Sequence, residues 1–525
     1  MGTFIAGPSL PRLTVSATDL GCILDCNLDT GLTIAGAAPT DNYARLQGFL
    51  STAVTLPLRL IIDGGTALSA PLVIPAGSNV TIAGVGKYSG FYMLSGANGP
   101  CITNKLGAPF EPIINGTVPA QSGSLHLENF RIEGNRAGNS TSGNLRGIIT
   151  SYPSSWFTSS TNLYCNLDLC NLARLVVRDL ISNNSPLYAA RITNCSDVLV
   201  DNYNNLNTYG DSLTVFNGDG LHFSGPIDRL RVCNSTINTN SDDGIPLNCP
   251  EGYGGNITNV LIENCHIIGY SMMRLYCGTY TMNNIHLRNF TGSGYLCALL
   301  LGIQTGVTVA TGGLTVAVDQ IADFEAAGGS VTLPSTAKAF SILCNSFGGL
   351  RLKSLRWNSP PSAVPFVALA NTGLNVSEFL VDDITVYRTT TGSAAAGALI
   401  DTAVNAGSGT ANTLVVKRLT IRGYKIADEA GQSFSAIPYL LNIGSGSSIG
   451  ELFIESLDPK NITALVSSAN GWTNITSVAG AGVLACGFQI PDALMAVNTP
   501  YISATGANAG KMCIQHTAGT VVVIG

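Results

Sequence analysis

One pattern of apolar and polar positions recurs along most of the chain. Each copy is a short run that alternates between apolar and other side chains, followed by a polar pair and another apolar residue. The period of two, the β-branched residues and the flanking Gly, Asn or Ser are the signature of a short β-strand. The copies are VTIAGV (80–85), LHLENF (125–130), LVVRDL (175–180), VLVDNY (198–203), LRVCNS (230–235), VLIENC (260–265), IHLRNF (285–290), LRLKSL (350–355), FLVDDI (379–384), LVVKRL (414–419) and LFIESL (452–457).

The spacing of the copies predicts the fold class. From LHLENF onward, the second polar residue of each copy is a marker, and successive markers lie 50, 23, 32, 30, 25, 65, 29, 35 and 38 residues apart. Steps of about 25–35 residues match one solenoid turn of three short strands, whereas a propeller blade needs about 40–45 and an immunoglobulin-like sandwich about 100. We therefore predict an all-β protein, a right-handed parallel β-helix (solenoid), in which the two long steps each hide one further coil. The markers are Asn129, Asp179, Asn202, Asn234, Asn264, Asn289, Ser354, Asp383, Arg418 and Ser456.

Both ends of such a stack expose strand edges that need a cover. Residues 41–53 begin with Asp41 as a candidate N-cap and carry apolar residues at helical spacing, which predicts an amphipathic capping helix. Residues 304–345 interrupt the repeat as a Gly/Ala/Thr-rich insertion, and two short strand-like runs after about residue 480 predict a small C-terminal β module. The expected domains are an N-terminal segment with the capping helix (1–56), the β-helix (57–465) and the C-terminal module (466–525).

Composition narrows the class of partner. The chain is 45% hydrophobic but only 11% charged, which excludes a disordered chain, and its Gly, Asn, Ser and Thr disfavour long helices. A net charge of −6 without a basic cluster argues against a nucleic-acid partner. The N-terminus does not read as a secretory signal, and no apolar run is long enough to span a bilayer. The 14 Cys follow no scaffold or metal-site spacing, so we expect buried thiols and predict neither a metal nor a cofactor.

The scarce acidic residues gather at one place. Asp219 and Asp243 are 24 residues apart, close to one coil, and Asp242 adjoins the second. Stacking would bring the three carboxylates to one strand edge, with Arg274 one coil further on nearly the same ladder. Hydrolysis of a glycosidic bond needs one protonated and one ionised carboxyl, and crowding of like charges raises the pKa of one of them. An adjacent Arg could hold an acidic sugar bidentately.

A structural alternative accounts for the same phrases. Asn-Gly-Asp-Gly (217–220) and Ser-Asp-Asp-Gly (241–244) are ordinary turn sequences, because Asn, Asp and Gly close tight turns. Turns of this kind stack by necessity in a β-helix. Histidines in strands, such as His222, are more often packed or on the surface than catalytic, and Tyr253 and Tyr276 serve either coil packing or stacking on sugar rings.

The N-terminal phrases resemble a known module. The order Asp41-Asn-Tyr-Ala-Arg-Leu-Gln47, a strand with Gly64-Gly65, a Pro-Ala-Gly turn at 75–77 and then VTIAGVG is similar to the N-terminal module of pectate-lyase-superfamily β-helices in bacteriophage tailspikes. The motif covers about 50 residues, and the coil pattern extends the resemblance to about residue 460. The resemblance implies a virion protein of the phage tail, and it implies that the C-terminal module helps to form a homotrimer.

The acidic phrases resemble a second group with this fold, the polygalacturonase-type glycoside hydrolases. That family's Asn-x-Asp-Gly matches Asn217 to Gly220, its Asp-Asp pair matches Asp242-Asp243, and its Arg-x-Lys aligns with Arg274-Leu-Tyr276. The resemblance implies that Asp242 is the general acid and that Asp219 and Asp243 position water in an inverting reaction. The family's Gly-His-Gly falls near Glu251-Gly-Tyr253-Gly, without a His, and its substrate-binding Lys is Tyr276 here, which puts pectin as substrate in doubt. The expected substrate-binding residues are Arg274, Tyr276, Tyr253, Asn217, His222 and Glu251.

Three functions follow as hypotheses. The leading one is a tailspike or receptor-binding protein, made in the host cytoplasm and carried on the virion, that binds and hydrolyses a bacterial capsule, O-antigen or exopolysaccharide and contacts other phage tail proteins. The second is a non-catalytic virion adhesin or structural tail protein of the same fold. The third is a free polysaccharide lyase or hydrolase.

Overall fold

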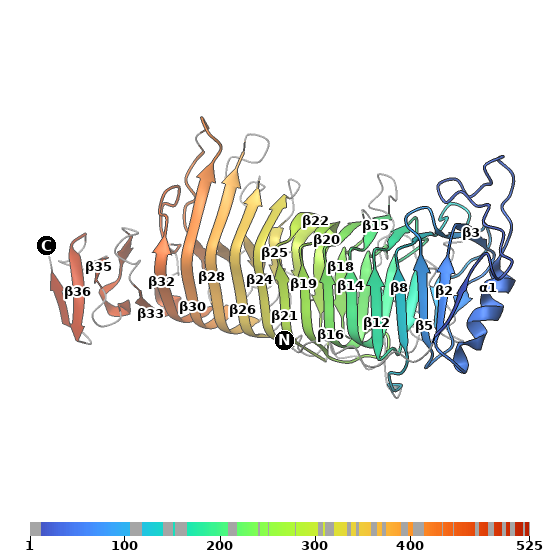
Figure 1. Cartoon of the computed structure of the whole chain (residues 1–525). Helices are drawn as coiled ribbons and strands as arrows, with labels where there is room; N and C mark the ends of the chain where they lie inside the picture. The colour runs from blue at the N-terminus through green and yellow to red at the C-terminus, as the bar shows by residue number, and fades with distance from the viewer. Residues whose placement is uncertain are drawn as a thin grey trace. The chain divides into compact units, whose positions relative to one another are not determined.

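The chain divides into two compact units, Met1–Tyr270 with Thr308–Leu314, and Ser271–Val307 with Thr315–Gly525. Each unit consists mainly of parallel strands that lie side by side in successive coils (Figure 1). The structure is a computed structural model that describes residues 12–104, 118–139, 151–152, 165–207, 218–239, 242–249, 251–278, 280–302, 308–309, 320–332, 338–342, 346–358, 365–369, 374–389, 397–402, 414–432, 434–444, 446–467, 472–480, 488–495, 500–503, 510–517 and 520–523.

The first unit is a stack of coils with a parallel pairing register that repeats from coil to coil. One inward position of each coil forms a ladder of buried aliphatic residues that runs through the unit. Its members are Leu58, Val80, Leu125, Leu175, Val198, Leu230 and Val260. The parallel β-helix predicted from the repeat is therefore confirmed, since each repeated phrase is one rung of a common core.

Most strands of the first unit have seven residues or fewer, whereas β14 and β16 have 12 and 13. In chain order they are β1 (Leu13–Ser16), β2 (Leu58–Ile62), β3 (Gly65–Leu68), β4 (Leu72–Val73), β5 (Asn79–Gly84), β6 (Gly90–Met93), β7 (Ile102–Thr103), β8 (Ser124–Glu128), β9 (Arg131–Glu133), β10 (Ser151–Tyr152), β11 (Leu167–Cys170), β12 (Arg174–Arg178), β13 (Ile181–Asn183), β14 (Ala190–Asp201), β15 (Asn204–Asn207), β16 (Leu221–Cys233), β17 (Thr236–Thr239), β18 (Ile245–Asn248), β19 (Ile257–Glu263) and, paired with β10, β23 (Thr308–Val309). The boundary between the units falls inside β20 (His266–Tyr276).

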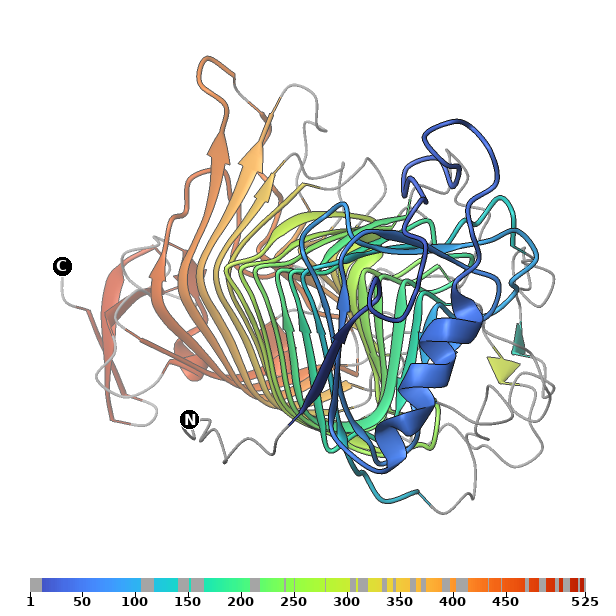
Figure 2. The ribbon, with the colours of Figure 1, turned by 45° about the vertical axis from the view of Figure 1, so that its right-hand side comes forward.

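A helix covers the first coils, as predicted. Helix α1 (Tyr43–Leu50) lies against the end of the first unit (Figure 2) and continues into the 3₁₀ turn η1 (Ser51–Val54). Its Gln47 side chain accepts a hydrogen bond from the backbone N–H of Val73 at 2.7 Å and donates one to the Val73 carbonyl at 3.0 Å, so it pairs with the edge of β4 as a neighbouring strand would. The N-cap is Asn42 rather than the predicted Asp41, because the Asp41 carboxylate instead accepts hydrogen bonds from Ser69 as well as Tyr43.

The second unit repeats the construction with longer strands. Its coil strands are β21 (Thr281–Arg288), β22 (Thr291–Leu301), β24 (Gln320–Thr332), β25 (Lys338–Ile342), β26 (Ser346–Asn358), β27 (Val367–Leu369), β28 (Leu374–Arg388), β29 (Ile400–Asp401), β30 (Leu414–Asp428), β31 (Leu441–Asn442), β32 (Ser448–Leu457) and β33 (Ile475–Ala479). The buried ladder here consists of Ile285, Phe324, Leu350, Phe379, Leu419, Leu452 and Val478.

The C-terminal module forms a sheet of its own, as predicted, although it begins later than expected. Because β33 still pairs with β32, the coils extend to Ala479 and beyond the predicted boundary at residue 465. The four strands of the separate sheet are β34 (Gln489–Ile490), β35 (Pro500–Ser503), β36 (Met512–Thr517) and β37 (Thr520–Val523). The turns η2 (Trp472–Asn474) and η3 (Asp492–Leu494) flank this transition.

The marker residues share a backbone conformation. Eight of the ten predicted markers, from Asn129 to Asp383, have a positive φ between 47° and 60°. Asn and Asp adopt this left-handed conformation more readily than other non-glycine residues, which explains why they recur at the corner of each coil. Arg418 was aligned wrongly as a marker, because Gly423, with φ of 76°, occupies the corner that follows Asp383 in register.

The two long steps between markers have different origins. The 65-residue step hides one coil, as predicted, since β24 pairs with β21 on one side and β26 on the other, and Gly328 takes the corner position. Residues 320–332 and 338–342 therefore continue the coils, and the predicted insertion at 304–345 is wrong for these two stretches. The 50-residue step hides no coil, because β8 pairs directly with β12.

The described part of the chain contains one α-helix, α1, of 8 residues. No helix within those residues has the length and apolar character needed to cross a membrane.

Candidate active site

The three predicted aspartates lie at the start of two stacked strands of the first unit. Asp219 precedes β16, and Asp242 and Asp243 precede β18. The backbone N–H of Gly220 donates to the carbonyl of Asp243 at 3.0 Å, so the 24-residue spacing is one coil. Gly220 has room only for hydrogen here, because a Cβ would lie 2.5 Å from the carbonyl oxygen of Gly244.

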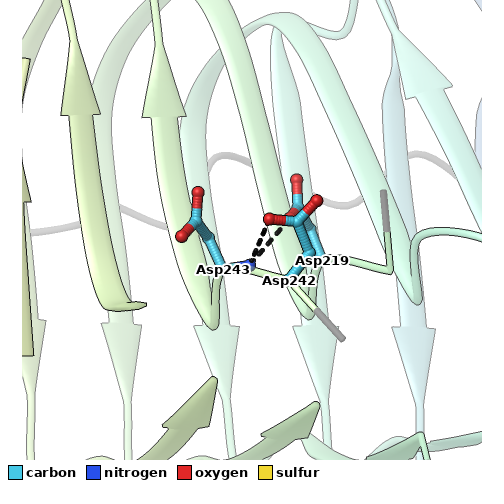
Figure 3. Close-up of side chains that lie close together, drawn as sticks. All are labelled: Asp219, Asp242 and Asp243. Carbon is cyan, nitrogen blue, oxygen red and sulfur yellow. Dashed lines mark hydrogen bonds between the residues drawn. The ribbon is translucent and has the colours of Figure 1, made fainter. Parts of the chain in front are cut away.

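The three carboxylates converge. One oxygen of each lies within 4.8 Å of the others, and all three side chains project to the same side of the strand edge (Figure 3). The backbone N–H of Asp243 donates to Oδ1 of Asp219 and to Oδ1 of Asp242, at 3.0 Å in both cases. Asp219 and Asp243 are buried, whereas Asp242 is partly exposed. A ligand would therefore meet Asp242 first.

His222 lies between Asp219 and a fourth acidic residue. It is 1% exposed, and its Nδ1 lies 2.6 Å from Oδ2 of Asp219. Its Nε2 lies 2.8 Å from Oε2 of Glu251 and 3.1 Å from Oγ of Ser224. The ring of Tyr188 stacks on the imidazole, with centroids 4.5 Å apart and planes 14° apart. His222 is thus a packed histidine, as the structural alternative in the sequence analysis predicts.

A turn after β18 explains why this outward-facing histidine is buried. His222 alternates with the core residues Leu221 and Phe223, so its side chain points away from the core. The turn carries Glu251 back over the strands, and Asn248 Nδ2 donates to Oε1 of Glu251 at 3.0 Å. Gly252, with φ of +70°, packs so closely that a Cβ would lie 2.4 Å from Thr193 Cγ2. The turn therefore covers the polar face of the strands.

The remaining predicted site residues have mixed positions. Tyr253 is 6% exposed, and its hydroxyl accepts a hydrogen bond from Asn171 at 2.9 Å, which favours packing over sugar stacking. Arg274 and Tyr276 belong to the second unit, where the guanidinium lies 5.6 Å from the centre of the tyrosine ring. Asn217 lies outside the described residues.

Burial and the histidine act in opposite directions on Asp219. Burial raises the pKa of Asp219 to about 6, although the hydrogen bond from His222 and the charge of its imidazolium lower it. Burial disfavours protonation of His222, but the carboxylates of Glu251 and Asp219 outweigh this effect and raise its pKa to about 9. The residue with the raised pKa is therefore Asp219, to which the sequence analysis gave a water-positioning role.

The two shifts predict a loss of stability with rising pH. Both groups bind their proton more tightly in the folded protein than at their ordinary pKa values of 3.8 and 6.5. The contribution of Asp219 is present below pH 3.8 and is lost as the pH rises through about 6, and that of His222 is present below 6.5 and is lost as the pH rises through about 9. We expect the apparent melting temperature to fall between pH 6.5 and 9. Over this range the free energy of unfolding should decrease by up to about 3 kcal/mol.

Thermal melts of the wild type and His222→Gln across this range check the expectation. The variant has no imidazole to titrate, so its melting temperature should depend less on pH than that of the wild type. An equal slope in both proteins would assign the pH dependence to other groups.

The spacing of the carboxylates bears on the predicted stereochemistry. Inverting glycosidases keep their two carboxyl groups ~6.5–9.5 Å apart to admit a water molecule, and retaining enzymes keep them ~5–5.5 Å apart. Measured between nearest oxygens, all three aspartates here lie within 4.8 Å of one another. This spacing lies below both ranges and selects neither inversion nor retention, so the anomer released first is the measurement that decides.

Among the residues that the structure describes, the three aspartates form the one group of His, Cys, Asp or Glu whose ligand atoms lie close enough together to hold a metal ion. Three carboxylate oxygens are half or less of the 6–8 that a calcium ion takes. Closeness alone does not distinguish a cation site from a site for proton transfer, and we assign no metal to these residues.

The second unit has a shallow hollow of about 230 Å³ on the outward face of β26, β28, β30 and β32. Two of its three arginines have these acidic partners: Arg418 contacts Glu451 at 3.3 Å, and Arg422 contacts Glu455 at 2.5 Å. Cross-strand ion pairs of this kind are a usual way to stabilise a sheet surface, so the hollow is explained by structure alone. It is lined by Arg351, Glu378, Phe379, Leu380, Arg418, Thr420, Arg422 and Phe453.

No family model and no curated protein matches the sequence. Among solved structures, two mutant forms of the tailspike protein of E. coli bacteriophage HK620 align over 89% of this chain and 78% and 80% of theirs, with TM-scores of 0.52 and 0.50 and 12% identity. The N-terminal fragment of bacteriophage Phi29 gene product 12 aligns over 95% of this chain and 73% of its own, with a TM-score of 0.49 and 13% identity. At such identity the likeness to the two tailspike forms concerns the fold alone, and it confirms the predicted tailspike-like parallel β-helix fold.

Proposed function

We propose that the chain is a phage tailspike or related virion protein that binds a bacterial surface polysaccharide and hydrolyses it at Asp219, Asp242 and Asp243. The observation that carries the proposal is the convergence of three carboxylates, two of them buried, at one strand edge. Burying carboxylates side by side costs free energy that a surface turn need not spend, and perturbed acids of this kind cluster at functional sites. The tailspike-like fold supports the choice of a polysaccharide as the ligand.

The proposed reaction assigns one role to each position. Asp242, the partly exposed member, donates its proton to the glycosidic oxygen as the C–O bond breaks. Water attacks the anomeric carbon and gives its proton to Asp219 or Asp243. The products are two shorter chains, one with a new reducing end.

The test is a panel of purified capsular, O-antigen and exopolysaccharides incubated with the protein. New reducing ends without ultraviolet absorbance from an unsaturated sugar support a hydrolase. Absorbance would indicate a lyase, which eliminates rather than hydrolyses. Binding to a polysaccharide with no product of either kind would overturn the catalytic part.

One observation favours the non-catalytic adhesin as the second candidate. Both oxygens of Asp219 already accept hydrogen bonds within the fold, from Asp243 N–H and from His222. A carboxylate that accepts hydrogen bonds at both oxygens can also stabilise a turn. If no cleavage product is found, the role of Asp219 is therefore structural.

The proposal includes a homotrimer on the virion, in contact with other tail proteins. The C-terminal sheet β34–β37 is the expected trimer-forming module, because it lies outside the coils and makes a sheet of its own. Light scattering should give three times the chain mass of 54.4 kDa. Deletion of residues 481–525 should reduce the mass of the assembly to that of one shortened chain. A monomeric mass for the whole chain would contradict the trimer.

A further inference from the structure

His222 and Glu251 have positions that differ from those expected of substrate-binding residues. His222 is 1% exposed, and the turn that carries Glu251 covers it. Tyr188 stacks on one face of its ring. A polysaccharide could reach the imidazole only if this turn moved away.

Both ring nitrogens of His222 face carboxylates. Nδ1 contacts Asp219 at 2.6 Å, and Nε2 contacts Glu251 at 2.8 Å. A carboxylate accepts hydrogen bonds and does not donate them, so two ionised carboxylates require a proton on each nitrogen, which is the imidazolium form. Glu251 is in turn held by Asn248 at 3.0 Å. The contacts form one hydrogen-bonded chain, Asn248–Glu251–His222–Asp219.

The chain fixes the carboxylate of Asp219 at both oxygens. His222 holds Oδ2, and the backbone N–H of Asp243, one coil further on, holds Oδ1 at 3.0 Å. Rotation of the carboxylate about its Cβ–Cγ bond would break both contacts. The orientation of Asp219 relative to Asp242 and Asp243 therefore depends on His222.

We infer that His222 and Glu251 are positioning residues that orient the carboxylate of Asp219 for catalysis and do not contact the polysaccharide. This replaces the substrate-binding role that we predicted for both, and it rests on the proposed hydrolase. An imidazolium that bonds Asp219 also favours its ionised form, which a water-activating carboxylate needs.

The kinetic test compares His222→Gln and Glu251→Gln with the wild type on the polysaccharide that it cleaves. Misorientation of a reacting group costs up to about 100-fold in rate, so we expect kcat to fall by about 10- to 100-fold while KM changes less than about twofold. In His222→Gln the acid limb of the pH profile should move to higher pH, since Asp219 loses the imidazolium. A raised KM with kcat retained, or no change in either constant, would overturn the inference.

Two controls separate orientation from folding. Glu251→Gln preserves size and a hydrogen-bond acceptor, so it is expected to fold even where His222→Gln does not. His266→Gln makes the same substitution at an exposed histidine of β20 and should leave both kcat and KM unchanged. A fall in kcat in His266→Gln as large as that in His222→Gln would show a general effect of the substitution and overturn the inference.

A spectroscopic readout does not depend on activity. The chain has 5 His, so nitrogen-labelled imidazoles can be assigned by comparison with His222→Gln. We expect His222 to be doubly protonated at neutral pH in the wild type and to titrate at lower pH in Glu251→Gln. If no polysaccharide is cleaved, the proposed function fails. A doubly protonated His222 would then mark a purely structural ion cluster, and its positioning role in catalysis would be overturned. A neutral His222 overturns the positioning chain itself.

Discussion

Replacing Asp242 with Asn is expected to lower polysaccharide cleavage by about 1,000-fold while the protein stays folded. Loss of a general acid typically costs 10²–10⁴-fold in rate, and an amide has no proton to give to a leaving oxygen. Asp242 suits this test because it is partly exposed, so that the change buries no unpaired group. Initial rates of reducing-end formation, measured at saturating polysaccharide, check the expectation.

The matched control is Asp179→Asn. Asp179 is exposed at the corner of an earlier coil of the same unit, with φ of 51°, and the next two coils have Asn at the same corner, with φ of 53°. The same chemical change there should alter neither the melting temperature nor the rate. Cleavage by Asp242→Asn at the wild-type rate would remove the general-acid role, and equal losses in both variants would point to a general effect of lost charge.

Asp219→Asn would be a less direct test of the chemistry. The substitution weakens the contact with His222. The buried imidazolium would then keep only one of its two carboxylate partners. A loss of activity would then mix catalysis with stability, because a buried charge without its partner is destabilising. Asp242 separates the two effects.

The repeated phrases allowed the fold to be predicted because one physical constraint acts on every coil. Most coils turn a corner in the left-handed conformation, and Asn or Asp marks that corner in the sequence, as at Asn129 and Asn202. Where glycine takes the corner, as at Gly328 and Gly423, the Asn or Asp marker is missing from the sequence. This is why a coil was mistaken for an insertion and Arg418 was mistaken for a corner.

The site was predictable only in part, for a similar reason. The 24-residue spacing of Asp219 and Asp243 was visible, because residues one coil apart become neighbours. The contact of Glu251 with His222 was not, because it depends on a turn that folds back over the strands. A turn of this kind leaves no periodic trace in the sequence, so burial of the outward-facing His222 could not be foreseen.

We also did not predict from the sequence a second buried charge, that of Arg191, which lies beside His222 in register. Arg191 pairs with His222 across β14 and β16, and with Asp168 across β14 and β11. The three residues lie 23 and 31 residues apart, which are ordinary coil steps. An acidic residue followed by a basic one at the same position of the next coil, Asp168 and then Arg191, was therefore the available signal, and it predicts a stabilising ion pair between neighbouring strands.

Replacing Arg191 with Met is expected to give the largest loss of stability among single changes at this face, about 3–5 kcal/mol. Arg191 binds Asp168 through two hydrogen bonds, Nε–Oδ1 at 2.9 Å and Nη2–Oδ2 at 2.8 Å, and each residue is 2% exposed. Without Arg191, the Asp168 carboxylate would stay buried with its main partner gone. Its desolvation would then be uncompensated, and the apparent melting temperature measures the effect.

The exposed pair of Arg231 and Glu263 provides the matched comparison for Arg191→Met. Arg231 Nε lies 2.8 Å from Oε1 of Glu263, but the arginine side chain is 53% exposed, so Arg231→Met should cost less than about 1 kcal/mol. The double change Asp168→Leu with Arg191→Met should recover much of the loss, because it removes the stranded carboxylate along with its partner. Equal losses for the two arginines, or no recovery in the double variant, would mean that packing of the long side chain, and not the buried charge, stabilises this face.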